Sequence, residues 1–331
     1  MIAVVVGQKK VEWMVTESDV AAAAAVIRDG GLVAFPTETV YGLGGNALDA
    51  EAVASIFEMK SRPRLDPLIV HIAAADDLAD LVQSVPDAAS ALIERFWPGP
   101  LSLVLSRKPC IPDIVTAGLP SVAVRCPDHE TARRLIRAAG VPVAAPSANR
   151  FGKVSPTTAA HVIEQFGEQV RVLDDGPCRV GVESTVISFV DSPDGKPTLL
   201  RPGGITLEEI ESTIGPVAKH THEESRPSSP GQLTQHYSPS TRLVLADAVA
   251  ADELKGRKKG LLSFRPPGSV EDYAATEVLS EEGSLREAAV NLFAAIRRLD
   301  AQGLDVIVAE PVPETGLGRA IMDRLRRAAA R

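Results

Sequence analysis

Hydroxyl groups and a carboxylate directly follow the first apolar run of the chain. Residues 32–35 predict a buried strand, and Thr37, Glu38 and Thr39 come immediately after it. In α/β proteins, loops at strand ends bind ligands, and these groups suit a small polar substrate. Gly42 would let the backbone approach such a ligand closely. A plain turn is the alternative interpretation of this segment.

A second cluster places cations at a predicted helix end. Lys60 and Arg62 would offer a point charge and a forked donor, a combination that suits a polyphosphate. The alternative is a solvated basic helix end, which the helix dipole favours. His71 lies inside the apolar run 68–72, so it is either a ligand-binding residue or a buried core histidine.

Arg125 raises the question of a buried charge. It lies on one face of the apolar run 122–126, where burial is costly unless the guanidinium is paired. The partner could be a protein carboxylate or the carboxylate of a substrate amino acid. The residues alone leave these two possibilities equally open.

Two later loops supply neutral hydrogen-bonding groups and another arginine. Ser147, Asn149 and Ser155 form one group, and Ser155 is expected near a helix start, where backbone amides favour phosphate. They could equally be capping residues. Ser184 is expected at the start of a strand and Arg201 at the end of another.

Familiar nucleotide and metal signatures are missing from the sequence. Gly42 and Gly44 lack the third glycine and the context of a dinucleotide fingerprint, and no GxxxxGK[ST] segment occurs. His220 and His222 lie in a proline-rich stretch without carboxylates at ligand spacing. We therefore expect no Walker-type loop and no protein-built metal site.

Predicted strands and helices alternate through the first 214 residues, which indicates an α/β fold. The first helix is expected over 20–28, capped by Ser18 or Asp19. An irregular loop is expected over 36–45.

The composition and the apolar pattern of the chain change after residue 214. Segment 215–240 carries four prolines and five serines without an apolar period, which predicts a linker. Alternation resumes over 241–331 and predicts a second, smaller Rossmann-like α/β domain.

Composition excludes several classes of protein. The 331 residues are 45% apolar and 24% charged, which is typical of a globular protein. The net charge of −8 argues against binding nucleic acid mainly through phosphates. Cys110, Cys126 and Cys178 form no CxxC pair and are expected to be buried thiols in a reducing compartment. No signal peptide or membrane span is recognisable, so a cytoplasmic protein is expected.

Seven segments in this order resemble the threonylcarbamoyl-AMP synthases, whose catalytic part is called the YrdC-like domain. They are FPTETVYGLG (35–44), KSRPRLDPL (60–68), WPGPL (97–101), SVAVRCP (121–127), APSANRFGKVSPT (145–157), ESTV (183–186) and LRPGG (200–204). SPGQLTQHYSP (229–239) and LGRAIMDRLRRAA (317–329) resemble the linker and the C-terminal domain of the longer form. The resemblance implies a YrdC-like twisted mixed-sheet domain over 1–214, a linker that acts as an active-site lid over 215–240, and a C-terminal domain over 241–331.

The resemblance also implies a role for each matching residue. L-Threonine would be held by Thr39, His71, Arg125 and Ser184 with the Ala145 backbone, Arg125 binding its carboxylate. ATP would be held by Lys60, Arg62, Ser147, Asn149, Ser155 and Arg201, with Asp66 and Ser121 alongside and Tyr237 closing over the nucleotide. Lys60 and Arg62 are the expected catalytic residues.

The implied reaction joins L-threonine, bicarbonate and ATP, with Mg²⁺, into threonylcarbamoyl-AMP and pyrophosphate. A threonylcarbamoyl transferase complex would then modify adenosine 37 of tRNA (t6A), so strong direct tRNA binding is not expected. Asp66 departs from the family, which commonly has Asn there; a role in holding Mg²⁺ or a pair with Arg62 would accommodate it. Residues 232–235 also depart from the more basic linker of the family.

Two other functions stay open at this point. A YrdC-like domain has a concave surface that could bind RNA, although the net charge argues against this. An enzyme acting on carbamoyl phosphate is the second, but its relatives carry a zinc finger that this chain lacks the CxxC pairs to build.

Overall fold

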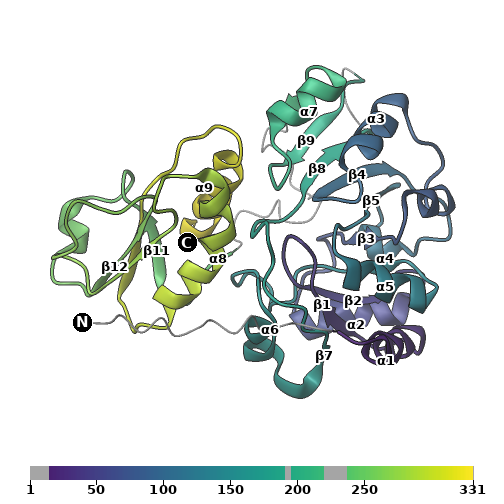
Figure 1. The fold of residues 1–331 in the computed structure, drawn as a ribbon, viewed down its shortest axis with the longest axis horizontal. Helices are drawn as coiled ribbons and strands as arrows, with labels where there is room; N and C mark the ends of the chain where they lie inside the picture. The colour runs from purple at the N-terminus through teal and green to yellow at the C-terminus, as the bar shows by residue number, and fades with distance from the viewer. Residues whose placement is uncertain (1–14, 191–194, 220–236, 331) are drawn as a thin grey trace, which may run out of the picture.

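The computed structural model describes residues 15–190, 195–219 and 237–330. Its strands form two separate sheets, a large one on the right of Figure 1 and a small one on the left. The α/β class with a mixed first sheet and a smaller second one is confirmed. Residues 220–236 of the predicted linker, including His220 and His222, lie outside the described residues.

The large sheet is mixed, with neighbouring strands in the order β10-β9-β8-β4-β5-β3-β6-β2-β1-β7. Its strands are β1 (Val33–Phe35), β2 (Gly42–Asn46), β3 (Ile69–His71), β4 (Leu101–Ser106), β5 (Ser121–Arg125), β6 (Val143–Ala144), β7 (Arg171–Val172), β8 (Thr185–Ser188), β9 (Thr198–Arg201) and β10 (Ala218–Lys219). β10 lies beyond residue 214 and pairs with β9.

β2 corrects the prediction of an irregular loop over 36–45. Its sequence Gly-Leu-Gly-Gly-Asn has little intrinsic strand preference. It is a strand because it pairs antiparallel with both β1 and β6. At Gly44 a Cβ atom would lie 2.6 Å from both Phe35 and Val143, so the small residue is what lets the neighbouring side chains fit.

Helices flank the large sheet. They are α1 (Glu17–Arg28), α2 (Ala50–Lys60), α3 (Asp87–Phe96), α4 (Asp113–Thr116), α5 (Glu130–Ala139), α6 (Ala159–Phe166) and α7 (Leu207–Ile214), with 3₁₀ turns η1 (Ala75–Asp80) and η2 (Gly167–Gln169). The cap of α1 differs from the expectation. Thr16 is the N-cap, and Asp19 bonds back to it, which makes a capping box and starts the helix earlier.

The small sheet is parallel throughout, in the order β11-β14-β12-β13. Its elements are β11 (Arg242–Leu245), η3 (Ala251–Leu254), β12 (Lys259–Ser263), β13 (Ala275–Val278), α8 (Leu285–Asp300), β14 (Val306–Ala309) and α9 (Gly318–Ala329). β13 was not expected, because this half-buried edge strand carries Thr and Glu rather than an apolar run.

Helices α8 and α9 face the large sheet's half of the molecule (Figure 1). An apolar cluster crosses the boundary and packs Val40, Val154 and Val182 with residues of both helices. At Gly181, where φ is +78°, a Cβ atom would lie 2.3 Å from the Ala289 carbonyl oxygen of α8. The two halves therefore meet in close backbone contact.

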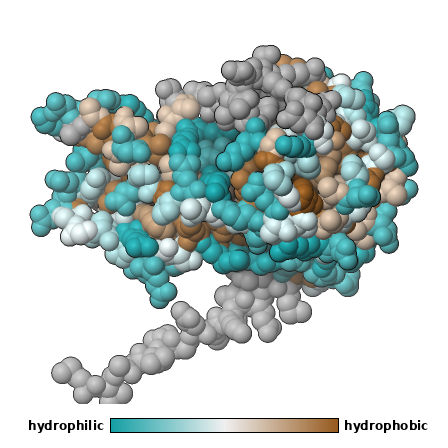
Figure 2. All heavy atoms as spheres, turned by 90° about the horizontal axis from the view of Figure 1, so that it is seen from above, coloured by the Kyte–Doolittle hydropathy of each residue, from teal (hydrophilic) through white to brown (hydrophobic). Residues whose placement is uncertain are grey.

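The face shown in Figure 2 is mostly polar, with apolar residues in scattered patches. Among the described residues, no helix combines the length and apolar character needed to cross a bilayer. Cys126 and Cys178 are buried, as expected, but Cys110 is exposed. The expectation fails for Cys110 because it lies in the connection between β4 and α4 rather than in a packed element.

The contact at Gly181 predicts a large effect for G181A. The added methyl group would overlap α8 in addition to straining a left-handed backbone. Gly140 is a control, because it is left-handed, with φ of +69°, but nothing lies within 4 Å of its Cβ position. In urea unfolding, G140A should lose roughly 1–2 kcal/mol from strain alone. G181A should lose roughly 1–3 kcal/mol more. Equal losses would contradict the packing described here.

Candidate functional site

Strand ends bring the candidate residues to one edge of the large sheet. His71 and Arg125 are paired neighbours at the ends of the parallel strands β3 and β5. Ser184 precedes β8 and Arg201 ends β9; because these two strands are antiparallel, both residues lie at the same edge. β4 pairs with both β8 and β5 and joins the two groups.

These strand ends surround a cavity, which we call the strand-end cavity. Its lining residues are Thr37, Thr39, Val40, Gly42, Arg62, Ile69, His71, Arg125, Ala145, Pro146, Ser147, Glu183, Ser184, Arg201 and Tyr237. Most residues predicted for threonine and ATP are therefore together. The predicted residues outside this lining are Lys60, Asp66, Ser121, Asn149 and Ser155.

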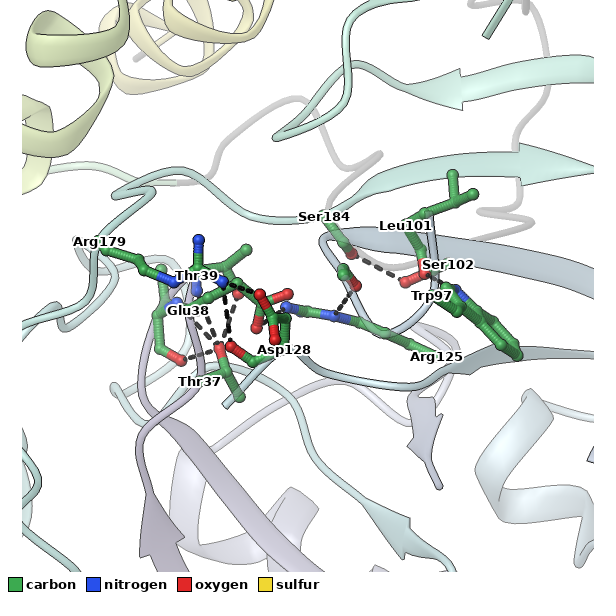
Figure 3. Close-up of polar contacts among 12 residues, drawn as sticks. Thr37, Glu38, Thr39, Trp97, Leu101, Ser102, Arg125, Asp128, Arg179 and Ser184 are labelled. Carbon is green, nitrogen blue, oxygen red and sulfur yellow. Dashed lines mark hydrogen bonds and ion pairs between the residues drawn. The ribbon is translucent and has the colours of Figure 1, made fainter. Parts of the chain in front are cut away.

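Arg125 is buried and pairs with a protein carboxylate. Its Nη2 lies 2.7 Å from Oε2 of Glu38, and its Nε donates to the Gly99 carbonyl at 3.3 Å. Figure 3 shows the Arg125 side chain extending toward Glu38. Of the two partners left open by the sequence, the protein carboxylate is present, while Arg125 also lines the cavity.

Residues 37–40 form a structured turn that is also a cavity wall. The Thr37 hydroxyl donates to the Val40 carbonyl at 2.7 Å and accepts from the amides of Thr39 and Val40. The hydroxyls of Thr37 and Thr39 are 2.8 Å apart (Figure 3). The turn and the ligand-binding interpretations of this segment are thus compatible.

His71 lines the cavity as a neutral imidazole. Burial, reinforced by the nearby charge of Arg125, lowers the pKa of His71 to about 3. Its Nδ1 is buried and has no hydrogen-bond partner in the described part of the chain. Its ring meets that of Phe35 edge-on, with centroids 6.2 Å apart.

Lys60 does not line the cavity. Its buried ammonium donates to the Ser147 carbonyl at 2.5 Å and to the Asn149 carbonyl. Burial first, and then the charge of Arg62, places the pKa of Lys60 well below its usual value. The observed contacts make Lys60 a support for the loop that carries Ser147.

Arg62 enters the cavity because the chain turns sharply after α2. Ser61 ends the helix in a left-handed conformation with φ of 52°. Arg62 Nη2 then lies 2.9 Å from the Asp66 carboxylate, and the guanidinium also donates to the carbonyls of Asp66 and Pro67. Of the two roles considered for Asp66, the structure contains the pair with Arg62.

Asn149 and Ser155 hold loops together beside the cavity. The Asn149 amide donates to the carbonyls of Arg150 and Lys153, and Ser155 donates to Glu183 at 2.6 Å. Ser155 lies near a helix start, as expected, but does not cap it, because α6 has Thr158 as its N-cap. Ser121 is buried at the start of β5.

The segments around Ser184 and Arg201 are locked together. Arg201 donates to the Ser184 carbonyl at 2.9 Å and to its hydroxyl at 3.1 Å, and the hydroxyl lies 2.8 Å from that of Ser102. A Cβ atom at Gly203 would lie 2.3 Å from the Ser184 carbonyl carbon. Only glycine permits this contact without displacing the backbone.

Tyr237 belongs to the C-terminal end of the predicted linker and lines the cavity. It is buried, has a left-handed φ of 62°, and stacks on Phe293 of α8 with ring centroids 5.6 Å apart. Burial raises the pKa of Tyr237 to about 12. The hydroxyl is therefore protonated and can donate a hydrogen bond.

Sequence reasoning missed several supporting residues. Glu38 and Glu183 lie in segments it singled out, and each carboxylate pairs with a buried arginine. The need for a carboxylate near Arg125 was the available signal for Glu38. Arg324 of α9 binds Glu183 from 141 positions away, and nothing in its local sequence distinguishes it from nearby arginines.

No group of three His, Cys, Asp or Glu side chains in the described residues is arranged to hold a metal ion. Glu183 is the carboxylate among the cavity lining, and both its oxygens already accept bonds, from Ser155 and Arg324. Mg²⁺ with ATP keeps mostly phosphate and water ligands and does not need a protein cage.

Comparison with known proteins assigns most of the chain. Residues 25–203 match the Sua5–YciO–YrdC family, described as telomere recombination, and residues 205–330 match the family described as threonylcarbamoyl-AMP synthase, C-terminal domain. The threonylcarbamoyl-AMP synthase of Pyrococcus abyssi is 46% identical, with 92% of each chain covered. That of Bacillus subtilis is 44% identical, with 96% of this chain and 95% of the relative covered.

A solved structure extends the match to three dimensions. The crystal structure of P. abyssi Sua5 complexed with L-threonine has a TM-score of 0.88 and 44% identity, and the match covers 96% of this chain and 95% of that one. The similarity thus includes both sheets. The chain belongs to the threonylcarbamoyl-AMP synthase family.

Proposed function

We propose that the strand-end cavity makes threonylcarbamoyl-AMP from L-threonine, bicarbonate and MgATP and releases pyrophosphate. The observation that carries the proposal is the presence of two separate cationic centres in one cavity. Arg125 forms one; Arg62 and Arg201, which both interact electrostatically with Tyr237, form the other. One centre suits an amino-acid carboxylate and the other a triphosphate.

L-Threonine would bind at the Arg125 end. Its carboxylate would take guanidinium N–H groups beside the Glu38 pair, and the hydroxyls of Thr39 and Ser184 would meet its polar side chain. His71 would accept or donate one hydrogen bond without adding charge. The solved P. abyssi relative, with L-threonine bound, supports this assignment.

ATP would bind at the other end, with Arg62, Arg201 and Ser147 at the phosphates and Tyr237 beside the nucleotide. Mg²⁺ would enter as part of the MgATP substrate. Lys60, Asn149 and Ser155 would act by fixing the loops that carry these groups.

The chemistry would need positioning more than a reactive side chain. The threonine ammonium group and bicarbonate give a carbamate, with loss of water and a proton. A carbamate oxygen then attacks the α-phosphorus of ATP, and pyrophosphate leaves. Holding reactants in such an orientation contributes about 7–11 kcal/mol in well-aligned systems. The fixed guanidinium groups would stabilise charge that develops on the phosphates.

The wider setting follows from the product. A mixed anhydride of this kind is consumed by a transferase, and a t6A-forming complex acting on tRNA is the proposed acceptor. A cytoplasmic location and a lid over residues 215–240 remain predictions from the sequence.

Arg62 gives the first test of the ATP end. R62A should lower kcat for ATP-dependent pyrophosphate release by roughly 10²–10³-fold, as removal of a fixed donor does elsewhere. Arg64 is the matched control, since it is two positions away and exposed, and R64A should stay within about twofold of wild type. Thermal melts verify that both variants fold. Wild-type turnover by R62A would refute the assignment.

Arg125 tests the threonine end. R125K keeps the charge but not the planar fork. It should raise the KM for threonine roughly 10–100-fold, because a hydrogen bond to a charged group contributes about 1.5–3 kcal/mol. The KM for ATP should change little. R179K, at an exposed arginine near Glu38 in Figure 3, is the control. Equal changes in both KM values would argue against a separate threonine end.

A further inference from the structure

Arg324 of α9 is buried between the two halves of the molecule. Its side chain is fully shielded from solvent although it belongs to the small sheet's half. Its Nε donates to Glu183 at 2.9 Å, and its Nη1 donates to the Pro202 carbonyl at 2.7 Å. The guanidinium carbon lies 5.3 Å from the centre of the Tyr237 ring. Arg324 therefore contacts three segments that carry cavity residues.

Each of these contacts leads directly to the cavity. Glu183 itself lines it, and the next residue, Ser184, is held by Arg201. Pro202 follows Arg201 directly, and the Gly204 amide donates to the Glu183 carbonyl at 3.0 Å. Moving Arg324 would thus loosen the two backbone segments that present Ser184 and Arg201.

The charges explain why Arg324 is needed at this position. Burial alone would raise the pKa of Glu183, but the guanidinium groups of Arg324 and Arg201 outweigh burial and lower it. Glu183 is therefore an anion beside the phosphate end of the cavity. With Arg324 absent, that anion would be drawn toward Arg201, the remaining nearby cation.

We infer that Arg324 is a positioning residue through which the C-terminal half completes the ATP end of the cavity. It holds the Glu183 carboxylate away from Arg201 and keeps the loop after β9 in register with β8. The inference rests on the function proposed above and adds a role for the C-terminal half. Arg324 acts through Glu183 and Pro202 and does not itself line the cavity.

The consequence should be larger for one substrate than for the other. Ser155, Arg201 and Tyr237, which surround Glu183, belong to the proposed ATP end. Arg125 and His71 lie on β5 and β3, and no contact of Arg324 involves them. Removing Arg324 should therefore weaken ATP binding more than threonine binding, which keeps Arg125 and His71 but shares the Ser184 segment.

The test compares R324M with a second arginine on the same helix. Arg319 also crosses between the halves, with its Nη1 2.5 Å from Glu208 of α7, but neither residue lines the cavity. In calorimetric titrations, R324M should raise the Kd for MgATP roughly 10–100-fold, since small displacements of positioning groups have effects of this size. R319M should stay within about twofold for both ligands.

A double-mutant cycle tests whether Arg324 acts through Glu183. In the E183Q background no carboxylate needs restraint, so E183Q/R324M should bind MgATP within about threefold of E183Q. This comparison also serves if R324M alone unfolds, because the double variant leaves no unpaired Glu183 charge. If removing Arg324 from E183Q weakens MgATP binding as much as it does in the wild-type protein, the inference is overturned.

Other outcomes also separate the alternatives. Wild-type ATP affinity in R324M, or equal losses for ATP and threonine, would overturn the inference while wild-type pyrophosphate release still supported the proposed function. Loss of affinity in R319M equal to that in R324M would show a general effect of the interface, and would also overturn it. Failure of the wild-type protein to form the adenylate would instead refute the proposed function itself.

Discussion

The structure depends on pairing charges that have been removed from water. Arg62, Arg125 and Arg324 are buried, and each lies within 2.9 Å of a carboxylate oxygen from Asp66, Glu38 or Glu183. Leaving one member of such a pair alone typically costs about 3–5 kcal/mol. The carboxylates therefore hold the guanidinium groups in place before a substrate arrives. Groups already held in this way need little reorganisation when anionic ligands bind.

Sheet topology converts these local pairs into one site. Parallel β3 and β5 end side by side with His71 and Arg125, and antiparallel β8 and β9 bring Ser184 next to Arg201. Hydrogen bonds then connect the loops to each other. Lys60, for example, donates to the carbonyls of Ser147 and Asn149. The two cationic centres are fixed by backbone as well as by side-chain contacts.

Much of this arrangement could be predicted from residue types and order. The α/β class followed from alternating strands and helices, and the family motifs indicated most residues that line the cavity. Arg125 on an apolar strand signalled that a carboxylate must be near, but nothing identified Glu38, since either a protein or a ligand could supply it. Strand propensity gave the wrong prediction at β2, because pairing with two neighbouring strands outweighs the low strand preference of its glycines. Lys60 and Arg62 looked equivalent in sequence, but only Arg62 lines the cavity, and the left-handed turn at Ser61 lies between them.

The contact between Glu183 and Arg324 spans 141 positions of sequence, which gives it a consequence during protein synthesis. At a typical translation speed, Arg324 is added on the order of ten seconds after Glu183. On the ribosome, the nascent first domain must therefore exist for that time without the Arg324 partner of this carboxylate. Its fold can form early, but the wall around Glu183 reaches its final state only after α9 has emerged and docked.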